Sequence, residues 1–229
     1  MKNTLTYIVA CPHCGATKRV AFSPTPWSSE QAPLWSDGRV EFIGWCEPAW
    51  TQQCPSCKQF FILPAKSSLQ VEDEHCEDTG ALSYQSLKQA VFELSGEEKF
   101  ESRARLDAWW AYNNLHKDSA DDAIPALEKE FNQNNMRWLL DYFLKQEIPP
   151  YSLVFELFRL LGDNKEYNAL LNSFTIERYQ AWQQVRNTRN KQREAEFIMD
   201  EELKKRLFES FIKDKREAID KPMRPYRKP

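Results

Sequence analysis

Two stretches, Cys11-Pro12-His13-Cys14-Gly15 and Cys54-Pro55-Ser56-Cys57-Lys58, decide the fold of the N-terminal part of this chain. We call them the first knuckle and the second knuckle. In each, a proline fixes one backbone dihedral of the tight turn between two cysteines. A turn of this kind lets both thiols point at one ion, so the two knuckles together offer four sulfur ligands to a single metal.

The four cysteines also predict which metal is bound and what it does. Four sulfurs at tetrahedral spacing select zinc, or less often iron, over the hard cations. A four-thiolate site leaves zinc no open position for water or substrate, so we expect a structural Zn²⁺ ion held by Cys11, Cys14, Cys54 and Cys57. The alternative is a disulfide or a redox pair. It fits less well, because paired knuckles without a secretion signal are typical of a reducing compartment.

Residues next to the knuckles have supporting roles in this interpretation. Lys18, Arg19 and Lys58 follow the knuckles closely and are expected, with the backbone amides, to balance the negative charge of the thiolates. His13 would replace a sulfur only if one were absent. Cys46 ends an apolar run and is expected to be a small buried hydrophobe. Cys76 lies beside His75 in an acidic stretch, where too few further ligands are visible for a second metal site.

Four apolar runs in the first 66 residues predict β-strands. Residues 4–9 alternate between the two faces of a strand, and 18–22, 40–46 and 59–64 are rich in β-branched or aromatic residues. Together they indicate a small antiparallel ribbon with the metal at one end. The prolines and the Asp37-Gly38 pair between 23 and 38 favour an ordered loop.

Four of the eight tryptophans fall in this part of the chain: Trp27, Trp35, Trp45 and Trp50. A small ribbon has little interior, so these indoles pack on its back face, dock it on the rest of the chain, or form a partner site. Packing and docking are the ordinary outcome. We nevertheless name Trp27, Trp35 and Trp50 as the candidate partner-binding residues.

The knuckles also carry a family resemblance. A CP-x-C-G knuckle, a spacer of 39 residues with aromatic and Asp-Gly elements, and a closing CP-x-C resemble the bacterial CpXC family of zinc-ribbon proteins. The resemblance covers about residues 1–66 and implies zinc at the four cysteines. The family has no established activity, so it implies no reaction. Lys58 stands where a glycine is common in the family, which puts the turn of the second knuckle in question.

From Ser83 onward the apolar spacing changes to about 3.6 residues and predicts helices. We expect them over 83–94, 97–116, 125–146 with a weak point at 132–135, 151–161, 167–174, 176–185 and 197–219. In the second helix one apolar stripe is expected to face inward, with Arg103, Arg105 and Asp107 on the surface. The stripe consists of Phe100, Ala104, Ala108, Ala111 and Leu115, widened by Trp109, Trp110 and Tyr112. Glu97, Glu98 and Glu101 are expected to form an exposed acidic first turn.

These patterns predict an α+β fold in which a small N-terminal antiparallel zinc ribbon is followed by an all-α domain of helical hairpins. The expected boundaries are 1–66 for the ribbon with its Pro- and Trp-rich insertion, 67–82 for an acidic linker, 83–220 for the helical domain and 221–229 for a basic disordered tail. Residues 156–163 with the helix after them resemble one turn of a tetratricopeptide-type hairpin. No clean 34-residue period extends the resemblance.

Charge varies along the 229 residues, although the net charge is only −3. Residues 67–180 hold 21 acidic and 11 basic side chains, whereas 181–229 hold 9 and 14. The basic run 186–193 is usually a solvated surface or connector. The alternative interpretation is a phosphate-binding patch, with Tyr179 and Trp182 stacking on bases.

These features favour a non-enzymatic zinc-binding adaptor or scaffold that recognises a protein partner. The alternative is a nucleic-acid-associated ribbon that uses Lys18, Arg19, Arg39 and the basic C-terminal segment. The sequence shows no phosphate loop, HExxH or GxSxG motif that would predict an enzyme. The N-terminus has no apolar segment typical of a secretion signal, so we expect a cytoplasmic protein without a membrane partner.

Overall fold

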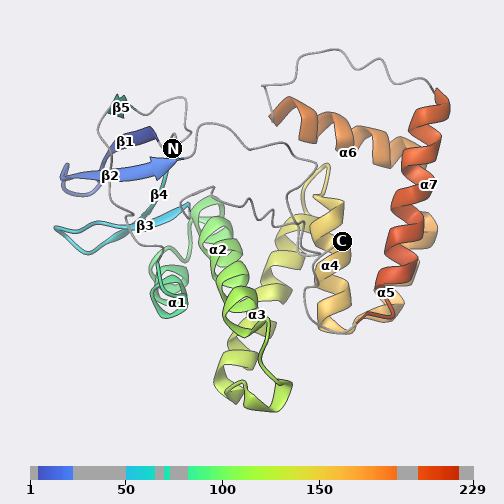
Figure 1. Cartoon of the computed structure of the whole chain (residues 1–229), viewed down its shortest axis with the longest axis horizontal. Helices are drawn as coiled ribbons and strands as arrows, with labels where there is room; N and C mark the ends of the chain where they lie inside the picture. The colour runs from blue at the N-terminus through green and yellow to red at the C-terminus, as the bar shows by residue number, and fades with distance from the viewer. Residues whose placement is uncertain (1–4, 23–49, 65–69, 73–81, 190–200, 222–229) are drawn as a thin grey trace. The chain divides into compact units, whose positions relative to one another are not determined.

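The computed structural model describes residues 5–22, 50–64, 70–72, 82–189 and 201–221. It confirms the predicted fold class: strands near the N-terminus are followed by seven helices among the described residues (Figure 1). The predicted strand at 40–46, the Pro- and Trp-rich loop and the C-terminal tail lie outside the described residues. So do Trp27, Trp35, Cys46, His75 and Cys76.

The described strands form two small antiparallel sheets. β1 (Leu5–Ala10) pairs with β2 (Thr17–Phe22) on one side and with β5 (Gln70–Glu72) on the other. β3 (Thr51–Gln53) pairs with β4 (Phe60–Ile62). β1, β2 and β4 were expected from their apolar pattern. β3 is polar in sequence and β5 falls in the expected linker, so neither strand was predicted.

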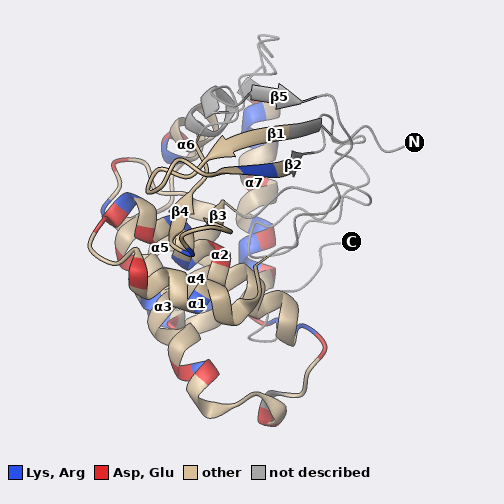
Figure 2. Cartoon of the chain, turned by 90° about the vertical axis from the view of Figure 1, so that its left-hand side faces the viewer, with Lys and Arg blue, Asp and Glu red and all other residues tan. Residues whose placement is uncertain are grey.

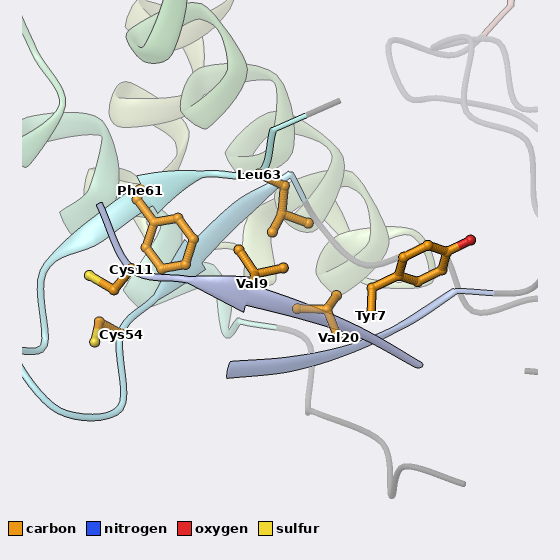
Figure 3. Close-up of a cluster of buried hydrophobic side chains, with 7 residues drawn as sticks. All are labelled: Tyr7, Val9, Cys11, Val20, Cys54, Phe61 and Leu63. Atoms are coloured by element: carbon orange, nitrogen blue, oxygen red, sulfur yellow. The ribbon is translucent and has the colours of Figure 1, made fainter. Parts of the chain in front are cut away.

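The side chains of β4 connect the ribbon to the first helices. Successive side chains of a strand point to opposite faces. Phe61 packs in the ribbon core with Tyr7, Val9 and Val20 (Figure 3). Phe60, 2% exposed, instead joins an apolar cluster formed by α1 (Tyr84–Glu93) and α2 (Glu98–His116). The ribbon and the first helices therefore share a core.

The chain divides into two compact units after Asn135, within α3 (Ala126–Leu144). The sequence-based boundaries place the division near residue 66 instead. The difference follows from Phe60, because a ribbon this small buries enough apolar surface only by packing on α1 and α2. The second unit continues with α4 (Tyr151–Leu161), α5 (Asn164–Ser173), α6 (Ile176–Arg189) and α7 (Glu201–Ala218).

Helix ends follow the local sequence signals. Ser83 caps α1, and its hydroxyl accepts a hydrogen bond from the Ser86 amide at 3.1 Å. Gly162 ends α4 in the left-handed conformation with φ of 75°. The weak point expected at 132–135 was wrong, because α3 is continuous there. The side chain of Asn135 accepts from and donates to Arg105, so its polar groups are satisfied by α2.

Several predictions about the faces of α2 were also wrong. Phe100 and Leu115, expected to face inward, are 37% and 57% exposed. Asp107 is buried, and its carboxylate accepts a hydrogen bond from the Thr51 backbone amide at 2.8 Å. Glu101 is buried as well and forms an ion pair with Arg105 at 2.7 Å. The partner of Asp107 comes from β3, far away in the sequence, whereas Glu101 pairs within its own helix at i,i+4.

Aromatic side chains fill the core of the second unit. Tyr179 and Trp182 of α6 are buried against Phe211 of α7, with ring centroids 5.3 and 5.5 Å apart. Phe155 of α4 lies 5.9 Å from the same ring. The proposed base-stacking role of Tyr179 and Trp182 is therefore wrong, since these rings serve the core.

Candidate metal centre

The two knuckles fold into nearly identical turns. In the first, the Cys11 amide donates to the Ala16 carbonyl at 2.8 Å and the Gly15 amide donates to the Cys11 carbonyl at 2.9 Å. In the second, the Cys54 amide donates to the Gln59 carbonyl at 2.9 Å and the Lys58 amide donates to the Cys54 carbonyl at 3.0 Å. The last residue of each turn has a positive φ, 73° at Gly15 and 65° at Lys58. Lys58 thus adopts the conformation that a glycine would adopt.

The turns bring all four predicted cysteines together. Their sulfur atoms lie within 4.8 Å of one another, and all four thiols are free. The Cys11 and Cys57 sulfurs are 3.7 Å apart, and those of Cys14 and Cys54 are 3.6 Å apart. A tetrahedral zinc site with Zn–S bonds of about 2.3 Å requires sulfurs about 3.8 Å apart. The spacing of the thiols fits such an ion.

Burial is graded across the four sulfurs. Cys54 and Cys11 belong to the buried ribbon core and lie side by side at one end of it, with Tyr7 at the other (Figure 3). Cys57 is half-buried and Cys14 is exposed. The centre therefore continues the apolar core on one side and meets solvent on the other.

The thiols have strongly different acidities. Hydrogen bonds from the backbone amides of Cys57 and Ser56 outweigh burial and lower the pKa of Cys54 to about 6. The Gln59 amide lowers the pKa of Cys57, but burial and the neighbouring sulfurs outweigh it and raise that pKa to about 12. Without a metal, the cluster thus forms its first thiolate at Cys54 and resists a second at Cys57.

Lys18 faces this centre from β2. It lies opposite Val9 of β1, and its ammonium group donates to the Gln52 side chain at 2.7 Å. Burial lowers the pKa of Lys18, and the nearby Cys54 partly restores it. At Lys18 the predicted charge compensation is supported by the electrostatic attraction between its ammonium group and Cys54. Lys58 instead donates to the Pro55 carbonyl at 2.7 Å, within its own knuckle.

The other candidate residues near the ribbon have different contacts. The His13 ring is not part of the sulfur cluster, and its Nε2 lies 3.2 Å from the Phe60 carbonyl oxygen. Trp50 packs against the ribbon core, and the Arg103 guanidinium lies 4.8 Å from the centre of its ring. Sequence reasoning missed Arg103 and Asp107, the two side chains of α2 that contact the start of β3. Their spacing within the helix gave no signal of this role.

The fold and the site together define an α+β protein whose N-terminal ribbon carries a four-cysteine cluster suited to a metal ion. Comparison with protein-family models, curated proteins and solved structures gives no match for this chain. The resemblances to CpXC ribbons and to tetratricopeptide hairpins therefore stay predictions. Among the described residues, no helix is long and apolar enough to cross a membrane.

Proposed function

We propose that this chain is a zinc-binding protein in which the metal is structural and the folded chain recognises a protein partner. The observation that carries the first part is the set of four free thiols within 4.8 Å, held by two matching turns. A site closed by four sulfurs supplies no position for a substrate, so its role is to fix the ribbon.

The ribbon needs a crosslink of this kind to be stable. Among the described residues, its core cluster contains seven buried side chains, and two of them are cysteines of the proposed metal site. A core of this size contributes little stability without a crosslink or a metal. When bound, zinc joins the two knuckles, and its binding free energy becomes folding free energy of the ribbon.

Partner recognition is supported by large apolar side chains on the surface of the first unit. Phe92 of α1 is 68% exposed and Leu127 of α3 is 76% exposed. Next to them, Phe131 lies 5.9 Å from the Phe92 ring. Exposed apolar groups that gather in this way mark interaction surfaces more often than isolated ones do.

A nucleic-acid partner is the second candidate, and one observation favours it. Residues 5–22 and 50–64 contain Lys18, Arg19 and Lys58 but neither aspartate nor glutamate. Figure 2 shows the basic residues of β2 as a blue segment of that strand. Phosphate binding through these side chains would weaken steeply as salt rises, whereas an apolar protein contact would not.

The metal hypothesis is tested on the purified chain. We expect one zinc per chain by mass spectrometry of the metal, and loss of that zinc in Cys14→Ser. Cys76→Ser is the matched control, since it also removes one thiol but leaves the four-cysteine cluster intact. A chain that folds without metal and with all six of its thiols titratable would contradict the proposal.

The partner hypothesis needs a separate test. The tagged chain, its Phe92→Ser/Leu127→Ser variant and a Lys18→Gln/Lys58→Gln variant are used to recover partners from nuclease-treated and untreated extract. A protein lost only with the first variant supports the adaptor role. Material lost with nuclease, with high salt and with the second variant supports nucleic acid instead. Equal recovery by all three chains contradicts both.

A further inference from the structure

The second unit contains a cavity of about 410 Å³ that the proposed function does not use. The end of α3, the connection from α3 to α4, the start of α4, and helices α5 and α6 all contribute to it. Its volume is near the lower end of the roughly 300–1,000 Å³ found for small-molecule sites. None of its lining residues belongs to the unit that holds the cysteines.

One part of the lining is apolar. It is formed by five side chains, each from a different segment: Leu144, Ile148, Tyr151, Leu170 and Ala181. Leu144 is 44% exposed even though its neighbour Phe143 is buried in the core. Because this apolar lining is exposed to solvent, covering it with an apolar group of a ligand is favourable.

The polar part of the lining holds two opposite charges. Arg178 of α6 and Glu147 of the segment after α3 both line the cavity. Arg178 makes one long side-chain hydrogen bond, from Nη1 to the Ser173 carbonyl at 3.4 Å. Among the described residues, no ion pair joins Arg178 to Glu147 or to another carboxylate. The guanidinium therefore retains N–H groups able to bind a carboxylate in the two-pronged geometry that arginine favours.

The acidic residue that precedes Arg178 in the sequence, Glu177, has its carboxylate bound elsewhere. Hydrogen bonds from the Thr175 hydroxyl and from the backbone amide of Glu177 itself lower the pKa of the Glu177 carboxyl. That carboxylate is thus held at the N-terminus of α6. It caps the helix and is not placed as the partner of the Arg178 side chain.

We propose that this cavity binds an apolar residue that carries a free α-carboxylate, with the carboxylate on Arg178 and the side chain against Leu144, Ile148 and Leu170. Two sources share this chemistry: the C-terminal residue of a peptide and a free apolar amino acid. In the second case the ligand's ammonium group has Glu147 at the same cavity as its counter-charge.

The proposal is tested by titrating the zinc-loaded full chain with four probes and following nitrogen-proton NMR shifts of residues 144–151 and 170–181. The probes are Gly-Gly-Gly-Phe with a free carboxylate, the same peptide amidated, N-acetyl-phenylalanine and free phenylalanine. We expect saturable binding of the carboxylate probes and at least a tenfold weaker response to the amide. Tighter binding of the peptide assigns a protein C-terminus, and tighter binding of phenylalanine assigns the amino acid.

Variants separate the two parts of the cavity. Arg178→Gln should weaken the carboxylate probes at least tenfold, whereas Lys165→Gln, which removes an exposed cation outside the cavity, should not. Ala181→Phe fills the apolar part and should block every probe, while its circular dichroism shows that α6 is retained. Equal binding of amide and acid, no effect of Arg178→Gln, or no saturable shift at millimolar probe would each overturn the proposal. Each of these results leaves the zinc content of the chain untouched, so the two proposals fail separately.

Discussion

At the scale of single residues, the two knuckles differ mainly in their last position. Gly15 and Lys58 both occupy left-handed backbone conformations, which cost an L-residue roughly 1–2 kcal/mol relative to glycine. The sequence already marks Lys58 as unusual, but it does not reveal whether the turn changes or the lysine adapts. The structure shows that the lysine adapts, and its ammonium group bonds within the knuckle.

This difference leads to a prediction for a matched pair of variants. Lys58→Gly should raise the free energy of unfolding of the zinc-loaded chain by about 1 kcal/mol, because it removes the backbone strain. Gly15→Ala should lower it by a similar amount, since no atom lies within 4 Å of the added Cβ and only the backbone term changes. Urea titration measures both. Shifts of the same sign in the two variants would contradict the argument.

A second residue-scale prediction concerns acidity in the metal-free, reduced chain. The pKa of Cys54 is lowered to about 6 in the folded state, below that of an unfolded thiol. Its thiolate therefore stabilises the fold fully above the unfolded pKa, about 8.5, and this stabilisation is lost as pH falls through 6. Cys57 acts in the opposite sense, because its raised pKa favours the fold below 8.5 and loses that effect toward 12.

The measurement is thiolate absorbance near 240 nm between pH 5 and 9, with a chelator and a reductant present. We expect a one-thiolate step centred near pH 6 that is absent in Cys54→Ser and retained in Cys76→Ser. Thermal unfolding of the metal-free chain should shift to higher temperature between pH 6 and 8.5. A first step above pH 8 would show that the backbone amides do not hold the Cys54 thiolate.

At the scale of elements, Asp107 connects the ribbon to the helices. Its carboxylate accepts the amide of Thr51 at the start of β3. Asp107→Ala would leave a buried amide unpaired, which costs roughly 1–3 kcal/mol. We therefore expect a loss of that size in urea unfolding, and a smaller loss in Asp107→Asn, which keeps an acceptor oxygen. Asp118→Ala, at an exposed position, is the control, and an equal effect of all three variants would refute the role of this contact.

The elements also show how much of the fold the sequence alone predicts. The knuckle spacing was sufficient to predict the sulfur cluster, and Ser83 and Gly162 mark their helix ends, because these signals are local. β3 carries the polar run Thr51-Gln52-Gln53, which is stabilised by pairing with β4 and by Asp107. Burial of Asp107 likewise depends on a partner distant in sequence, the Thr51 amide. Such long-range contacts produce no periodic pattern in a single sequence, so they cannot be predicted from it.

At the scale of the whole molecule, each compact unit has its own means of stabilising a core. The first has the sulfur cluster and the Phe60 contact with α1 and α2. The second has a buried ion pair within α4, where Arg159 donates to both carboxylate oxygens of Glu156 at 2.9 and 2.7 Å. Arg159 also donates to the Lys221 carbonyl just after α7, at 3.3 Å. The pair thus ties the last helix to the fourth.

This arrangement predicts that two variants act on different halves of the chain. Glu156→Gln removes the carboxylate that pairs with the buried Arg159 guanidinium, and breaking a buried ion pair costs roughly 3–5 kcal/mol, so amides of residues 151–174 should exchange with solvent much faster. Cys14→Ser removes one of the four proposed metal ligands and should accelerate exchange in residues 5–22 and 50–64 instead. Hydrogen exchange read by mass spectrometry resolves these peptides in one experiment, with Glu166→Gln as the exposed-carboxylate control. If each variant accelerated exchange equally throughout, the two cores would be one cooperative structure, and zinc would stabilise the entire chain rather than its ribbon.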